Sequence, residues 1–139
     1  MWNDFYRGYL ESEILNADPI KLICLLYTGA IERVAQARHC LRDRDIAGRS
    51  AAISKATAIV NQLMLSVDLE RGGEIGRNLV ELYDYIVRCL NQGNYTQADG
   101  PLGEAQLLLS QLSQAWEQCS RAGANRQDVE VYEPVSCAG

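Results

Sequence analysis

The sequence predicts an all-α fold, an antiparallel four-helix bundle with an additional short N-terminal helix or arm. Apolar residues recur at steps of three and four along most of the chain, no segment alternates like a β-strand, and the connections are short. With 47% apolar residues, the 139-residue chain is long enough for one hydrophobic core. We therefore expect an arm at residues 1–17, a helical bundle at 18–121 and a mobile tail at 122–139.

The first predicted helix runs from Pro19 to Arg42, after the aromatic-rich arm. Asp18 can cap the free backbone amides, and proline suits the first helical position. One apolar stripe follows at helical spacing: Ile20, Ile23, Tyr27, Ile31 and Val34. Gly29 lies in the middle of this helix, and close packing of a neighbouring helix is a better explanation for it than space for a ligand helix.

Three further helices are predicted. The second, Ile46–Leu69, has a near-heptad apolar spacing and matches the first in length, as expected for a helical hairpin. The third, Glu74–Gln92, starts after Gly72-Gly73, because two glycines disfavour a continuous helix. The fourth starts at Asp99-Gly100-Pro101 and ends near Ser120.

The third predicted helix carries two neighbouring apolar stripes. One stripe consists of Ile75, Leu79, Leu82, Ile86 and Leu90, and the other of Val80, Tyr83, Val87 and Leu90. A helix with two stripes either lies in the middle of a bundle or keeps one stripe for a partner. Tyr83 and Tyr85 face about 200° apart on a helix, so they cannot both point into one core. We expect Tyr83 to be buried and leave Tyr85 open between core and surface.

The sequence offers little for catalysis or metal binding. His39 is the only histidine and has no partner ligand at helical spacing. Glu81 and Asp84 lie three residues apart, but no histidine or nucleophile stands near them, so surface carboxylates are the simpler interpretation. The glycine-rich Gly72–Gly76 segment is followed by no phosphate-binding lysine and is better explained as a helix-helix turn. We therefore expect no enzyme activity, no cofactor and no metal.

Charge and hydropathy argue against nucleic acid and membranes as partners of this protein. The net charge of −5 and the pI of about 4.8 argue against nucleic acid. Five arginines near the end of the first helix are interpreted as a solvated face rather than an anion site: Arg33, Arg38, Arg42, Arg44 and Arg49. No apolar run is long enough to span a membrane, and the start of the chain does not resemble a signal peptide. Five widely spaced cysteines without a CxxC motif favour reduced thiols in a cytoplasmic protein.

The sequence resembles the flagellar secretion chaperone family FliS, the export chaperones of flagellin. Four segments carry the resemblance in register: Tyr9, Ile14, Ala17 and Pro19; Leu25-Leu26-Tyr27-Thr28-Gly29-Ala30; Asp68-Leu69-Glu70-Arg71-Gly72-Gly73-Glu74-Ile75 with Asn78-Leu79 and Leu82-Tyr83-Asp84-Tyr85; and Ala115-Trp116. Two departures stand out. Thr28 replaces the family's usual Asp or Asn, and the glycines and proline of residues 99–103 replace a continuous helix-forming stretch.

The resemblance implies a non-enzymatic cytosolic protein that binds the disordered C-terminal region of flagellin, prevents premature polymerisation and assists delivery to the flagellar type III export apparatus. Our candidate flagellin-binding residues are Tyr9, Ile14, Tyr27, Tyr83, Tyr85, Ile86 and Leu90. Components of the export gate are further candidate partners. The alternative is a self-associating structural bundle, such as a homodimer, in which the second stripe packs against a copy of the chain.

Overall fold

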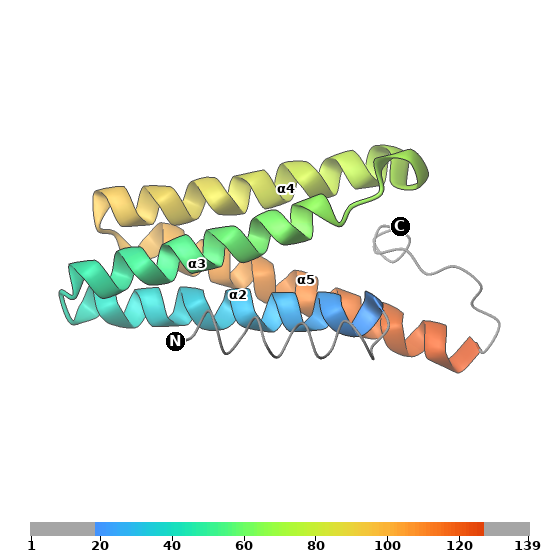
Figure 1. Ribbon diagram of the computed structural model, residues 1–139, viewed down its shortest axis with the longest axis horizontal. Coiled ribbons are helices and arrows are strands. Elements are labelled where there is room, and N and C mark those ends of the chain that lie inside the picture. Colours follow the sequence, from blue (N-terminus) through green and yellow to red (C-terminus); the bar gives the residue numbers. More distant parts are fainter. Residues whose placement is uncertain (1–18, 127–139) are drawn as a thin grey trace.

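The structure, a computed structural model, describes residues 19–126, and these residues form helices without any strand (Figure 1). The helices are α2 (Pro19–Arg42), α3 (Ile46–Leu65), α4 (Leu69–Thr96) and α5 (Asp99–Arg126). The all-α prediction is therefore confirmed for the described residues. The predicted arm at residues 1–17 lies outside them. No helix in residues 19–126 combines the length and apolar character that crossing a membrane requires.

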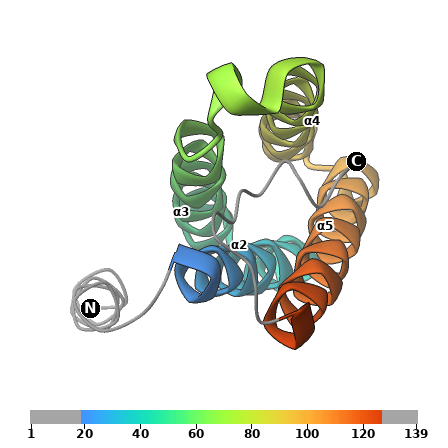
Figure 2. The ribbon, with the colours of Figure 1, turned by 90° about the vertical axis from the view of Figure 1, so that its right-hand side faces the viewer.

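The helices form a bundle in which each packs against the next, and α5 returns to pack against α2 (Figure 2). Arg38 of α2 binds Asp99 of α5 through two hydrogen bonds of 2.7 Å and donates a third, of 2.8 Å, to Gln106. The indole N–H of Trp116 donates to the carbonyl of Ile20 over 3.2 Å. The last turns of α2 thus lie beside the beginning of α5, and the first turn of α2 lies beside Trp116.

The connection from α2 to α3 follows the prediction, but one of its arginines does not. The carboxylate of Asp45 caps α3 by accepting from the backbone N–H of Gly48. Arg49 is only 5% exposed, and its Nε donates to the side-chain oxygen of Asn94 in α4 over 2.8 Å. The prediction that the arginines form a solvated face is therefore wrong for Arg49, which links α3 to α4.

The boundary between the second and third predicted helices is corrected by the structure. The first of the two ends at Leu65 instead of Leu69, because Asp68 caps the next helix through the backbone N–H groups of Glu70 and Arg71. α4 therefore begins before the glycine pair. Gly73, with φ 54° and ψ −127°, makes a kink inside α4 and does not precede it.

The ends of α4 and α5 lie beyond their predicted positions. α4 continues to Thr96, past the predicted end at Gln92, because Gly93 fits inside the helix where it contacts α5. A Cβ atom at Gly93 would lie only 2.6 Å from the side chain of Leu102. α5 begins at Asp99, as predicted, and continues to Arg126, so the predicted end near Ser120 is wrong.

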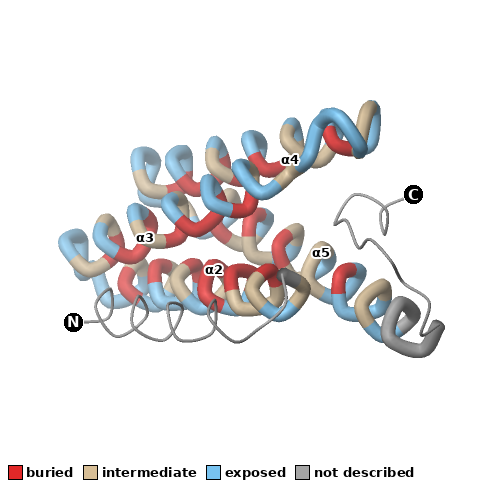
Figure 3. The backbone as a smooth tube through the Cα atoms, turned by 45° about the vertical axis from the view of Figure 1, so that its right-hand side comes forward, coloured by how far each residue is buried: buried red, intermediate tan, exposed pale blue. Residues whose placement is uncertain are grey.

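The core runs along the interior of the bundle, with buried positions facing inward and exposed positions outward (Figure 3). Its largest fully buried side chains are Ile53, Leu63, Ile86, Leu90, Leu102, Leu109, Val34 and Val60. Four of the five cysteines lie in described helices, with Cys40 and Cys89 buried and Cys24 and Cys119 half-buried.

Candidate partner-binding surface

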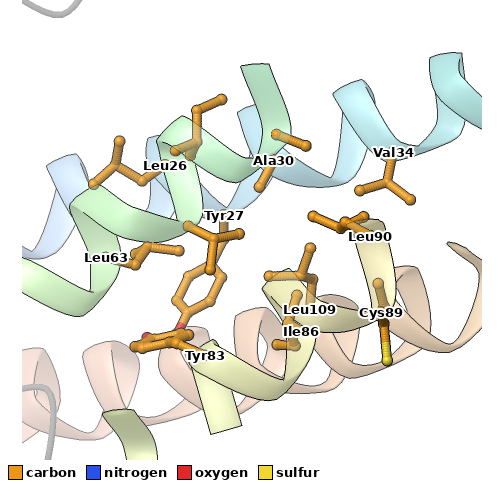
Figure 4. Packing of buried hydrophobic residues seen from close by; sticks show 14 of the residues in the cluster. Leu26, Tyr27, Ala30, Val34, Leu63, Tyr83, Ile86, Cys89, Leu90 and Leu109 are labelled. Carbon is orange, nitrogen blue, oxygen red and sulfur yellow. The ribbon is translucent and has the colours of Figure 1, made fainter. Parts of the chain in front are cut away.

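Two buried tyrosines meet across the bundle. The hydroxyl oxygens of Tyr27 in α2 and Tyr83 in α4 lie 2.6 Å apart within hydrogen-bond reach, and the two rings are 3% and 2% exposed (Figure 4). Burial raises the pKa of Tyr27 to about 12 against a smaller opposing effect of the hydrogen bond from Tyr83. Burial, followed by the neighbouring Tyr27, also raises the pKa of Tyr83. Both hydroxyls are therefore neutral near pH 7 and form one polar contact in an apolar interior.

Four of the candidate flagellin-binding residues lie in the core. Tyr27, Tyr83, Ile86 and Leu90 are all buried, which confirms the expected burial of Tyr83. In this arrangement of the helices, none of the four presents its side chain to a partner. Their participation in binding stays a prediction, as does that of Tyr9 and Ile14, which lie outside the described residues.

Among the candidate residues that the structure describes, Tyr85 is the one that reaches the surface. Its ring is 37% exposed, and its hydroxyl donates to the carboxylate of Glu104 in α5. The guanidinium carbon of Arg88 lies 5.7 Å from the ring centroid. The hydrogen bond to Glu104, followed by one to Cys89, raises the pKa of Tyr85. These contacts hold an amphipathic aromatic ring at the edge between α4 and α5.

The two halves of α4 differ sharply in burial. Five residues of Tyr83–Thr96 are buried, whereas Gly76 is the sole buried residue of Leu69–Leu82. The same first half contains Leu69 and Ile75, which are 50% and 37% exposed. Its apolar side is therefore left partly uncovered by the other described helices.

Neighbouring segments add to this uncovered surface, which we name the apolar end. It comprises residues near the beginning of α2, the α3–α4 connection, the first half of α4 and the later turns of α5: Ile20, Met64, Leu65, Val67, Leu69, Ile75, Leu79, Leu82 and Leu112. These segments lie at the same end of the bundle (Figure 1). Exposed apolar surface of this kind is typical of sites where proteins bind other proteins.

The apolar end shows which residues of the two apolar stripes on α4 are left uncovered. Ile75, Leu79 and Leu82, from the first stripe, are all at least partly exposed, while Ile86 and Leu90 of the same stripe are buried. Burial of the first stripe therefore increases along α4, whereas in the second stripe Tyr83 is buried and Val87 only partly so. Sequence reasoning missed Leu65 and Leu69 because both fell inside the predicted second helix. The capping residue Asp68 was the available signal that a new helix starts there.

The polar residues considered for chemistry have ordinary surface surroundings. His39 lies 3.0 Å from the carboxylate of Asp43, and Asp84 lies 3.1 Å from Arg88, both in exposed pairs. Glu81 is exposed as well. Among the described side chains, no group of three histidine, cysteine or acidic residues is arranged to hold a metal ion. Thr28 is exposed on α2, so this departure from the family pattern does not alter the core.

Comparison with known proteins gives a consistent result. The family model described as "Flagellar protein FliS" matches residues 2–123. A flagellar secretion chaperone FliS from Salmonella typhimurium is 40% identical over 112 residues, which cover 80% of this chain and 83% of the relative. Flagellar secretion chaperone FliSB from Pseudomonas aeruginosa is 35% identical over 78% of this chain and 86% of its own. The Vibrio cholerae FliS is 29% identical over 88% of this chain and 90% of its own.

Proposed function

Because this chain belongs to the FliS family of flagellar secretion chaperones, we propose that it binds the disordered C-terminal region of flagellin. Binding would prevent premature polymerisation and assist delivery to the flagellar type III export apparatus, including components of its export gate. The observation that carries the proposal is the uncovered first half of α4 together with the rest of the apolar end. A chaperone of this kind needs an apolar surface that remains accessible in the free protein.

The proposed mechanism is recognition of an amphipathic helix by an apolar surface. A disordered segment loses conformational entropy when it folds on binding, which costs several kcal/mol, about 2–5 or more, so wide apolar contact is required. Leu69, Ile75 and Leu79 would supply part of that contact. Tyr85 would mark its edge, since its exposed ring combines a large apolar area with a hydroxyl already held by Glu104.

The remaining candidate residues take supporting roles in this proposal. Tyr27, Tyr83, Ile86 and Leu90 would fix the position of α4 from within the core. Residues 1–17, with Tyr9 and Ile14, would form an arm that covers part of the binding surface when no flagellin is present. We further propose an antiparallel bundle that acts in the cytoplasm without enzymatic activity, cofactor or nucleic acid.

Titration calorimetry of the full chain with the C-terminal helical segment of flagellin from the same organism tests this function. We expect one-to-one binding and a gain of helical circular dichroism beyond the sum of the parts. Tyr85→Ala should weaken binding about tenfold, as expected for an aromatic anchor worth about 1.4 kcal/mol. Tyr95→Ala is the matched control. Tyr95 lies in the same helix and is 89% exposed, but it is near the end of α4 that is far from the apolar end. Absence of binding by a folded chain would contradict the proposal.

The alternative function is a self-associating structural bundle without flagellin binding. The apolar end supports this alternative as well, since a copy of the chain could cover the same surface. Sedimentation equilibrium of the chain without flagellin separates the two functions. A homodimer that persists on dilution and binds no flagellin would favour the structural alternative over the chaperone.

A further inference from the structure

A buried arginine near the beginning of α3 has no acidic partner among residues 19–126. Arg49 is only 5% exposed, and its Nε donates to the side-chain oxygen of Asn94 in α4 over 2.8 Å. This is the one hydrogen bond that its guanidinium makes with the described residues, and none of their carboxylates lies within 4.0 Å of it. Burying a charged group is costly unless an opposite charge or hydrogen bonds compensate for the lost water. Arg49 therefore differs from Arg38, which binds the carboxylate of Asp99.

The side chains around this guanidinium leave N–H donors unused. The side-chain oxygen of Asn94 accepts from Arg49 and, over 3.4 Å, from the hydroxyl of Ser50, so the amide nitrogen of Asn94 remains as a donor. The terminal nitrogens of Arg49 donate to no described atom, and they are not completely enclosed by the described protein. Two helices thus supply a positive charge together with free N–H groups. A carboxylate suits this combination, because it only accepts hydrogen bonds and can pair with a guanidinium through two of them.

The charged residues of the α2–α3 connection do not neutralise the buried guanidinium. The carboxylate of Asp45 caps α3, and that of Asp43 lies 3.0 Å from His39. Arg42 and Arg44 are exposed and add positive charge to the same end of the bundle. The local charge therefore favours a negatively charged partner, although the whole chain carries a net charge of −5.

Exposed apolar side chains flank the contact between Arg49 and Asn94. Ile46, three residues before Arg49 in α3, is 60% exposed, and Tyr95, which follows Asn94 in α4, is 89% exposed. Large apolar side chains beside a charged anchor are typical of surfaces that bind proteins. The beginning of α3 and the end of α4 lie at the same end of the bundle, whereas the α3–α4 connection lies at the other end (Figure 1).

We propose that Arg49 and Asn94 form a carboxylate-binding site for an acidic side chain of a second partner protein. The carboxylate accepts hydrogen bonds from the terminal nitrogens of Arg49 and from the amide of Asn94. Ile46 and Tyr95 contact an apolar residue next to that acidic side chain, so the partner presents a short segment that is both acidic and apolar. This site lies away from the apolar end, and it does not rest on the proposed function.

An NMR titration of the isotope-labelled, full-length chain with the dipeptide Ac-Asp-Leu-NH2 tests the site. We expect the Nε–H signal of Arg49 and the side-chain amide signals of Asn94 to shift and to saturate. Ac-Asn-Leu-NH2 has no carboxylate and should bind about tenfold more weakly. Arg49→Gln should weaken binding of Ac-Asp-Leu-NH2 about tenfold. Arg77→Gln is the matched control, because Arg77 is an exposed arginine in the first half of α4, and it should bind like the unaltered chain.

A second variant keeps the test independent of the core. Arg49→Gln also removes the contact with Asn94, so a loss of binding in that variant could come from altered packing. Tyr95→Ala changes only an exposed side chain, and it should weaken binding of Ac-Asp-Leu-NH2 about threefold while the circular dichroism spectrum stays the same.

Three results would overturn the inference. If Ac-Asp-Leu-NH2 causes no saturable shift at Arg49 or Asn94, the guanidinium is only solvated. If both dipeptides bind equally well, the site does not recognise a carboxylate. If Tyr95→Ala and Arg77→Gln bind alike, the exposed tyrosine is not part of the site. The titration contains no flagellin, so each result stands whether or not the chain binds flagellin.

Discussion

The hydrogen bond between Tyr27 and Tyr83 allows a quantitative test of how the core is held together. The two hydroxyl oxygens are 2.6 Å apart, and neither ring is more than 3% exposed. Tyr83→Phe removes one hydroxyl and leaves the other buried without its described partner. Leaving a buried polar group unsatisfied costs about 1–3 kcal/mol, and we expect each single Phe variant to lose that much unfolding free energy.

The double variant Y27F/Y83F provides the decisive comparison. It removes both polar groups and leaves no buried hydroxyl at this contact, so it should lose clearly less stability than the sum of the two single variants. We expect a coupling energy of about 1 kcal/mol or more, as residues in direct contact commonly show. Urea unfolding, followed by circular dichroism, gives the unfolding free energy of the unaltered chain and the three variants. The comparison requires that the slope of this free energy against urea concentration is the same in all four chains.

A control variant and a clear contrary result complete this test. Tyr95→Phe changes a hydroxyl that is on an 89% exposed side chain, and it should alter the unfolding free energy by less than about 0.5 kcal/mol. If the two core substitutions add without coupling, the hydroxyls do not depend on each other. The hydrogen bond between Tyr27 and Tyr83 would then contribute nothing to stability, which would refute our explanation of how the core is held together.

Three further predictions concern Tyr27, Gly73 and Asp99. The pKa of Tyr27 is raised to about 12 from an ordinary value of 10, so the neutral hydroxyl contributes fully to stability below pH 10. We expect the unfolding free energy to fall by about 2–3 kcal/mol as the pH rises from 10 to 12. The fall should be smaller in Y27F/Y83F when unfolding is measured at alkaline pH. Gly73→Ala should cost about 1–3 kcal/mol in urea unfolding because φ is 54°, whereas Gly100→Ala, with open space around it and no positive φ, should cost almost nothing. Asp99→Asn should cost about 1 kcal/mol or less, because the paired side chains are partly exposed. The hydrogen bond from Arg38 lowers the pKa of Asp99, so this contribution is present above pH 3.8 and should disappear as the pH falls below it, in thermal unfolding from pH 6 to 2.

The helices were predictable because their apolar spacing is long and regular. Pro19–Arg42 was predicted with its observed bounds, since a capping residue and a proline mark its start. The boundary around Asp68 failed because the glycine pair is the stronger local signal and its position suggested a helix start. In the structure, Gly73 instead takes a backbone conformation that lets α4 turn sharply after one turn of helix.

The candidate surface was harder to predict, because periodicity reveals an apolar side of a helix but not what covers it. Ile86 and Leu79 belong to the same stripe, yet Ile86 is fully buried and Leu79 only partly so. The difference depends on how closely four helices approach at each level, which no single helix encodes. Similarly, the two tyrosines of the core come from segments 56 positions apart, so their contact could not be read from local spacing.

The unequal burial along α4 separates residues that stabilise the fold from residues that, in the proposed function, contact a partner. The second half of α4, with Ile86, Leu90 and Gly93, closes against the other helices and holds the fold without a partner. The first half carries apolar side chains of comparable size, but it leaves them partly exposed. If these residues were needed for folding, substituting Leu69 by Ser would destabilise the free chain as much as substituting Ile86 by Ser. At 50% and 0% exposure, the two changes should instead separate, with Leu69→Ser reducing flagellin binding and Ile86→Ser reducing stability.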